Sequence, residues 1–448
     1  MRLLNNKDNR NLTINVIASL LIRGIGIIVA FLTVPCYMEY FNNNAVLGIW
    51  FTILSILTWV LTFDLGIGNG LRNHLTREIS NHNTIESKRL ISSAYISLGS
   101  VVIVFGIFYY ILSQHIDWNE ILNIDTSVIS DSGLRKSIDI SICGVLLSFF
   151  LRIIISILYA IQKAAIPNLI NLTSHILTLV YLVIITPSGN YDYDLISLSI
   201  VHACTTNIPL IIATLYVFSL TQLKECKPSI GYATKQGAKA VVTLGVVFLI
   251  LQILYMIIST TNEWFISYFY APEYSTIYQV YNKIFSFASS LFMIALTPVW
   301  SAISKALAEK RYEWINKITK IMYIAVCILA ILQVIIIPIL PYFINLWLGE
   351  NAIDFNLTYV IWFIIYGTMF AWIAVQSTIA SGISKLKVQT YCYTFAVIFK
   401  IVAITLLYQY FNEWIFVVSA TCVALLPYCV IQPIVIHRQL KQLNNINV

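Results

Sequence analysis

The sequence has few charged residues, and the polar stretches between its apolar runs are short. Only 10% of the 448 residues are Asp, Glu, Lys or Arg, whereas 59% are hydrophobic. Soluble domains usually carry about 25% charged residues, and the mean hydropathy here is +0.81. This composition excludes an ordinary water-soluble globular protein.

The eight cysteines show no spacing typical of a disulfide framework or a zinc site. They occur singly, mostly within apolar runs, and no C-x-x-C is present, which is typical of small packing residues. An ATP-binding motif is absent, and the three alternating glycines at 66–70 lack the preceding strand that a dinucleotide-binding loop requires. We therefore expect no cofactor and no metal ligands.

Apolar runs of about 20 or more residues dominate the chain, and a helix of this length crosses about 30 Å of hydrocarbon. They predict an all-α polytopic membrane protein with about 12 transmembrane helices. The expected spans are 14–34, 46–63, 91–112, 138–161, 166–185, 195–220, 241–267, 277–300, 318–344, 357–380, 388–407 and 414–436.

Basic residues collect in alternate loops, so they predict the orientation of the chain. Most of the 27 Lys and Arg residues lie on one side, whereas the opposite loops carry Arg135, Lys136 and many of the acidic residues. Loops rich in Lys and Arg stay in the cytoplasm. We expect a multi-pass protein of the bacterial inner membrane with both termini cytoplasmic. The net charge of +7 then reflects topology and not binding to nucleic acid.

A polar segment in the middle divides the chain into halves. We predict an N-terminal six-helix bundle at 1–220, a cytoplasmic linker at 221–240, a C-terminal six-helix bundle at 241–437 and a cytoplasmic tail at 438–448. Glu39-Tyr40-Phe41 with Trp50, and Ser267-Tyr268-Phe269 with Tyr281, form a faint parallel repeat. Transporters commonly place a substrate site between such halves.

Four basic residues lie inside predicted spans: Arg23, Arg152, Lys283 and Lys400. An arginine at the centre of a membrane helix costs at least about 2.5–3.5 kcal/mol. Such cations predict a cavity that binds an anion such as a phosphate or diphosphate. The alternatives are that Lys283 pairs with Glu263 and that Lys400 extends to the interface.

The second predicted span ends in an acidic residue that glycines follow. Asp64 and Glu263 are the acids nearest the membrane interior, so we expect them to serve in coupling or gating. Gly66 and Gly70 would let the backbone bend or let another helix approach closely. The simpler alternative for Asp64 is that it neutralises Arg72 or Arg77.

Five short motifs resemble those of bacterial O-antigen flippases, the polysaccharide-transporter branch of the multidrug/oligosaccharidyl-lipid/polysaccharide exporter superfamily. They are Gly48-Ile49-Trp50, Asp64 to Arg72, Tyr278 to Lys283, Pro298 to Ala302, and Asn345 to Gly349. The resemblance runs over nearly the whole chain. It implies two six-helix bundles in a V-shaped arrangement around a central cationic cavity.

The resemblance also implies a function. An undecaprenyl-diphosphate-linked oligosaccharide would cross from the cytoplasmic to the periplasmic leaflet. The mechanism we expect is alternating access, and a H⁺ or Na⁺ gradient would drive it because no ATP-binding motif is present. The protein would not be an enzyme. Its expected partners are this lipid-linked oligosaccharide, the lipid bilayer, a polysaccharide polymerase and a chain-length regulator.

Three other functions stay open. A drug exporter of the same superfamily would favour acidic residues inside, and the interior here is basic. A peptidoglycan-precursor flippase usually carries extra helices. A membrane-embedded polymerase or ligase acts on the same lipid-linked sugars, but it tends to have a larger external loop than the one at 113–137.

Overall fold

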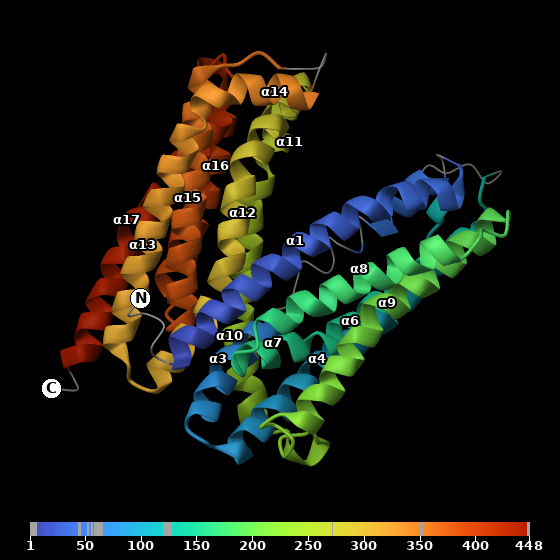
Figure 1. Cartoon of the computed structure of the whole chain (residues 1–448), viewed down its shortest axis with the longest axis horizontal. Coiled ribbons are helices and arrows are strands. Elements are labelled where there is room, and N and C mark those ends of the chain that lie inside the picture. The colour runs from blue at the N-terminus through green and yellow to red at the C-terminus, as the bar shows by residue number, and fades with distance from the viewer. Residues whose placement is uncertain are drawn as a thin grey trace. The chain divides into compact units, whose positions relative to one another are not determined.

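The computed structural model describes residues 7–43, 46–51, 53–54, 57, 66–119, 128–270, 272–348 and 353–445. Within these ranges the chain forms helices joined by turns and short connections, and no strand occurs (Figure 1). In these same ranges 10 helices are long and apolar enough to cross a membrane. The predicted class of all-α polytopic membrane protein is confirmed.

Two of the twelve predicted spans are not among these 10 helices. The span expected at 46–63 lies mostly outside the described residues. The span expected at 277–300 lies within α12 (Pro272–Ala308), which is a single helix of 37 residues.

The chain divides by packing into two compact units, Met1–Leu249 and Ile250–Val448. The first unit contains α1 (Lys7–Phe41), α3 (Ile67–Ser80), α4 (Thr84–Ser113), α6 (Asp131–Leu151), α7 (Ile153–Ala160), α8 (Ala165–Ile184), α9 (Tyr191–Leu220) and the short helix η2 (Ile230–Tyr232). Helix α10 (Lys235–Thr260) begins in this unit and ends in the second. The division by packing therefore lies beyond the linker predicted at 221–240.

The second unit contains the end of α10 and the helices that follow it. They are α11 (Asn262–Phe269), α12, α13 (Tyr312–Ile335), η3 (Ile337–Ile339), α14 (Leu340–Leu348), α15 (Leu357–Gly382), α16 (Lys387–Leu407), η5 (Tyr408–Tyr410) and α17 (Ile415–Asn445).

Several helices begin where a polar residue can cap the first free N–H groups. The side chains of Asn83, Ser130 and Asn190 accept hydrogen bonds from the backbone N–H three residues later, at the starts of α4, α6 and α9. Asn356 does the same for α15. Such caps contribute about 1 kcal/mol each, and they fix where four of the long helices start.

The two units repeat one packing pattern. In the first, α4 packs on α3 and α6, α7 packs on α3, and α9 packs on α6 and α8. In the second, α13 packs on α12 and α15, α12 packs on α15, and α17 packs on α15 and α16. The order of partners is the same, counting α6 and α7 as one broken span. This match supports the internal repeat that the sequence predicts.

Candidate functional site

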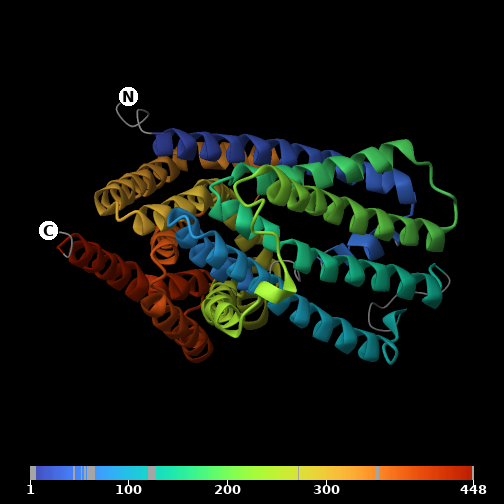
Figure 2. The same ribbon diagram turned by 90° about the horizontal axis from the view of Figure 1, so that it is seen from below.

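Helix α1 presents a polar face to the start of α8. Asn15, Ser19 and Arg23 are spaced four residues apart, which places them on one side of a helix. Asn15 donates to the carbonyl of Gln162 at 3.0 Å and accepts from the N–H of Ala165 at 3.3 Å. These bonds fix α1 alongside α8, as Figures 1 and 2 show. Arg23 is exposed about two turns further along α1.

Two histidines of the first unit are linked to Arg23 by electrostatic interactions. The charge of Arg23 acts on His175 of α8, and His175 interacts electrostatically with His202 of α9. The His202 ring makes an edge contact with fully buried Trp50, with centroids 5.9 Å apart. Arg23, His175, His202 and Trp50 therefore form one group, which we call the Arg23 group. Sequence analysis missed this grouping because the residues lie on four separate predicted spans.

Arg152 lies at a break in a membrane-spanning segment. It is half-buried between α6 and α7. Its N–H donates to Ser148 at 2.8 Å, while its carbonyl accepts from Ile155 at 2.9 Å, three residues ahead instead of four. Interrupted helices in transporters commonly carry substrate-binding groups. The expected contact of Arg152 with substrate stays a prediction.

Lys283 and Glu263 both lie exposed in the second unit. Glu263, on α11, accepts a hydrogen bond from the side chain of Gln279 on α12. Lys283 is one turn beyond Gln279 on the same helix. Asp64, the other predicted acid, lies outside the described residues.

Lys400 is fully buried in the second unit. Its Nζ donates to the carbonyl of Ile258 at 2.7 Å, to Thr261 Oγ1 at 2.9 Å and to the carbonyl of Ile257 at 3.5 Å. These acceptors lie at the end of α10, where helix carbonyls lack partners and a positive charge is favourable. The ammonium stays inside the protein and does not extend to the interface. This geometry gives Lys400 a structural role, and its predicted contact with substrate stays a prediction.

Gly66 and Gly70 lie directly against the backbone of α10. Gly66 has a φ of +70°, and a Cβ there would lie 1.9 Å from the carbonyl oxygen of Gly245. A Cβ at Gly70 would lie 2.3 Å from the carbonyl oxygen of Val241. A turn that favours glycine and a close helix approach therefore both occur here. The expected role of the two glycines in gating stays a prediction.

Helix α3, which follows Gly66, carries a buried arginine. Arg72 is only 2% exposed, and its guanidinium carbon lies 4.5 Å from the centroid of the Tyr159 ring on α7. Burial lowers the pKa of His74 on the same helix, and the charge of Arg77 lowers it further. The burial of Arg72 was not predictable from the sequence, because a basic residue that follows a membrane span is already explained by topology.

The described residues contain no group of three or more His, Cys, Asp or Glu side chains that could hold a metal ion. What they contain is a set of cations on membrane-spanning helices. Together with the repeated helix order, this set has the architecture of a membrane transporter.

Comparison with known proteins agrees with this class. No protein-family model matches the chain. Over 346 residues it is 22% identical to a protein of Yersinia pseudotuberculosis named "Putative O-antigen export protein", covering 75% of this chain and 76% of that protein.

The fold is that of solved transporters. An outward-facing multidrug resistance transporter of the MATE family matches with a TM-score of 0.74 at 11% identity, over 99% of this chain and 98% of its own. The Vibrio cholerae MATE transporter VcmN matches with a TM-score of 0.73 at 12% sequence identity, over 97% of both chains. A MOP superfamily transporter of Pyrococcus furiosus matches with a TM-score of 0.70 at 13% sequence identity, over 99% of this chain and 98% of its own. The resemblance stated from the sequence is confirmed, and the chain has the fold of these transporters.

Replacing Lys400 with Met should destabilise the protein. The change leaves the carbonyl of Ile258 without its donor inside the membrane, and hydrogen bonds to charged groups contribute about 1.5–3 kcal/mol. We expect a clearly lower melting temperature in detergent, measured by size-exclusion chromatography after heating. Lys283→Met, at an exposed position, is the matched control. Equal stability of Lys400→Met and the wild type would contradict the structural role.

Gly70→Ala should also destabilise the protein. The new methyl group would meet the Val241 carbonyl, so α3 and α10 must separate, and such overpacking typically costs about 1–3 kcal/mol. Gly24→Ala, where a Cβ meets nothing within 4 Å, should be neutral or stabilising because alanine favours helix. The same melting assay compares the two variants. A Gly70→Ala protein that melts no lower than Gly24→Ala would argue against a rigid contact.

Proposed function

We propose that this protein is a flippase for a lipid-linked oligosaccharide. Its substrate is an undecaprenyl-diphosphate-linked O-antigen repeat unit or a similar surface polysaccharide unit, moved from the cytoplasmic to the periplasmic leaflet of the bacterial inner membrane. The observation that carries the proposal is the position of Arg23 and Arg152 on membrane-spanning helices of a chain with a transporter fold. The O-antigen export relative supports the choice of substrate.

The chemistry of the cations suits a diphosphate. A guanidinium stays protonated and presents a planar fork of N–H donors, which matches phosphate oxygens two at a time. The diphosphate enters beside Arg23 and Arg152, with Lys283 as a further cation. Lys400 already has three acceptors, so we place it outside the substrate contacts.

The same fold is used for substrates of different charge. For the Pyrococcus furiosus transporter, the reverse polarity of the binding pocket is said to suggest a different function. Other structural neighbours are multidrug transporters. Basic groups within the spans of the present chain favour an anionic substrate over an organic cation.

The transport cycle follows alternating access. The sugars follow the diphosphate into the cavity, the prenyl tail stays in lipid, and the site then opens to the other side. Both termini remain cytoplasmic. An ion gradient, H⁺ or Na⁺, supplies the drive, with Asp64 and Glu263 as the candidate coupling groups. A polysaccharide polymerase and a chain-length regulator act on the product.

Arg23→Ala and Arg152→Ala should each reduce export by about tenfold or more at equal protein levels, because a phosphate contact worth about 1.4 kcal/mol corresponds to a factor of ten. Arg23→Lys and Arg152→Lys should keep partial activity, since they keep the charge and lose the fork. Restoration of surface polysaccharide in a deletion strain measures the effect. Arg89→Ala, on the exposed surface of α4, is the control. Full activity of both alanine variants would remove the anion-site proposal.

Asp64→Asn tests the coupling group separately. If Asp64 carries the coupling proton, export by this variant should lose its dependence on the pH gradient while the substrate still binds. Uptake of labelled lipid-linked oligosaccharide into vesicles at several external pH values measures this. An unchanged pH dependence would assign coupling elsewhere.

The location of the accumulated intermediate separates the flippase from an enzyme. In a deletion strain, single repeat units that a membrane-impermeant sugar-modifying enzyme cannot reach support the flippase. Single units that this enzyme can modify show that flipping is intact, and they would favour a membrane-embedded polymerase or ligase.

A further inference from the structure

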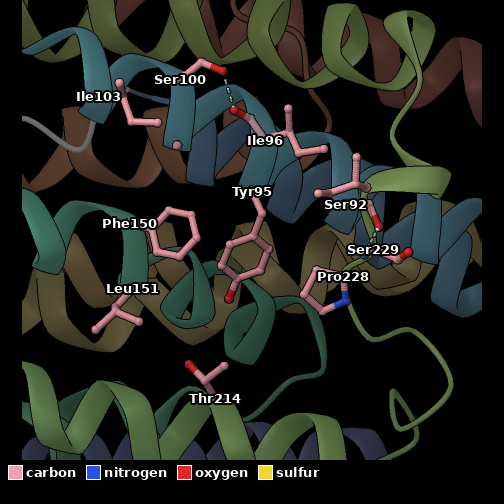
Figure 3. A pocket seen from close by; sticks show the side chains of 12 residues that line it. Ser92, Tyr95, Ile96, Ser100, Ile103, Phe150, Leu151, Thr214, Pro228 and Ser229 are labelled. Atoms are coloured by element: carbon pink, nitrogen blue, oxygen red, sulfur yellow. Dashed lines mark hydrogen bonds between the residues drawn. The ribbon is translucent and has the colours of Figure 1, made fainter.

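The first unit has an apolar groove that the proposed transport cycle does not use. It has a volume of about 510 Å³ and lies among α4, the end of α6, α9 and residues 228–230 (Figure 3). This is within the range of roughly 300–1,000 Å³ that ligand pockets occupy. Its lining is mainly hydrocarbon, from residues such as Ile96, Ile103, Phe150 and Leu151.

Exposed apolar side chains surround the open side of the groove. Ile103 is 64% exposed, and Ile230 at the rim is 85% exposed. The next residues of α4 beyond the groove, including Val104 and Ile107, are exposed as well. In a membrane-spanning helix such apolar side chains lie against lipid, so a hydrocarbon chain can enter the groove from the side.

The connection between α9 and α10 closes one end of the groove. The N–H of Ser229 donates to Ser92 Oγ at 3.0 Å, and the N–H of Thr234 donates to Ser93 Oγ at 3.1 Å. Tyr95 forms the floor. The centroid of its ring lies 5.3 Å from that of the Phe150 ring, and its hydroxyl points toward Thr214 (Figure 3). The groove therefore has a defined wall and floor.

Two lysines lie at this closed end. Lys88 is one turn before Ser92 on α4, and its Nζ lies 4.1 Å from the centroid of the Tyr232 ring. Lys227 directly precedes Pro228 of the lining and is exposed. Cys226, the neighbour of Lys227, donates from its Sγ to the carbonyl of Thr84 at 3.5 Å, so both lysines lie near the start of α4. The nearby acid Glu86 is paired with Arg89 at 3.4 Å, while Glu225 is exposed.

We propose that this groove binds one anionic glycerophospholipid from the leaflet that the sequence predicts to be cytoplasmic. One acyl chain occupies the groove, and the phosphate lies beside Lys88 and Lys227. An apolar groove with two lysines next to its closed end matches both parts of such a lipid. The lipid contacts α4, α9 and the connection that leads into α10. It is therefore a structural ligand, separate from the transported substrate near Arg23.

Binding of defined lipids to the purified protein tests the proposal. The protein is delipidated in detergent, incubated with phosphatidylglycerol or phosphatidylethanolamine, and analysed by native mass spectrometry. We expect one tightly held phosphatidylglycerol per protein and weaker retention of phosphatidylethanolamine. Equal retention of the two lipids would overturn the role of the lysines.

Two groups of variants locate the site. Ser100→Phe fills the groove and should weaken retention by about tenfold, whereas Val104→Phe, one turn further on the same helix and outside the lining, should not. Lys88→Gln and Lys227→Gln should each weaken it by about fivefold, the equivalent of roughly 1 kcal/mol per cation near a lipid surface. Lys320→Gln, on an exposed part of the second unit, is the charge control. Unchanged retention in Ser100→Phe would overturn the proposal.

Further controls separate this site from folding and from transport. If Ser100→Phe does not elute as a single monodisperse peak, Ser100→Leu replaces it with the same expectation. Undecaprenyl phosphate serves as a competitor: failure to displace phosphatidylglycerol supports the proposal, while displacement by equimolar undecaprenyl phosphate would assign the groove to the substrate tail. Because retention is measured without export, its outcome is independent of flippase activity.

Discussion

Backbone N–H and C=O groups inside a membrane must find their hydrogen-bond partners within the protein. This constraint explains why the described chain is helical, and it explains what happens where a helix ends. At the end of α10 the carbonyl of Ile258 has no helical donor available, and the buried ammonium of Lys400 supplies one at 2.7 Å. Burying the ammonium of Lys400 is costly, but it satisfies backbone carbonyls that would otherwise be unpaired.

Helix α10 meets this constraint through contacts at both of its ends. Its first part lies against Gly66 and Gly70 of α3, and its last turn is held by Lys400 of α16. The helix is continuous between these contacts, although the two ends belong to different compact units. The glycine contact and the lysine contact therefore lie on one continuous helix. Changes at either position should therefore affect the same element.

The length of the apolar runs was enough to predict the fold class, and motifs in order were enough to identify the superfamily resemblance. The environment of each interior cation was not predictable. Span 388–407 is apolar around Lys400 and has no polar stripe to show which side faces protein, so the sequence did not show that Lys400 is enclosed. The burial of Arg72 and the grouping of Arg23 with His175 and His202 depend on contacts between distant spans. No local pattern records such contacts.

The structure separates those cations by what surrounds them. Lys400 is enclosed and has acceptors for its donors, so its charge is accounted for without a ligand. Arg23 and Lys283 are exposed, and Arg152 is half-buried at a helix break. A charge on a membrane-spanning helix that the protein does not enclose requires water or an anion beside it. The proposed anionic substrate would therefore give a physical reason for the exposed charge of Arg23, which lies on α1 in line with Asn15 and Ser19.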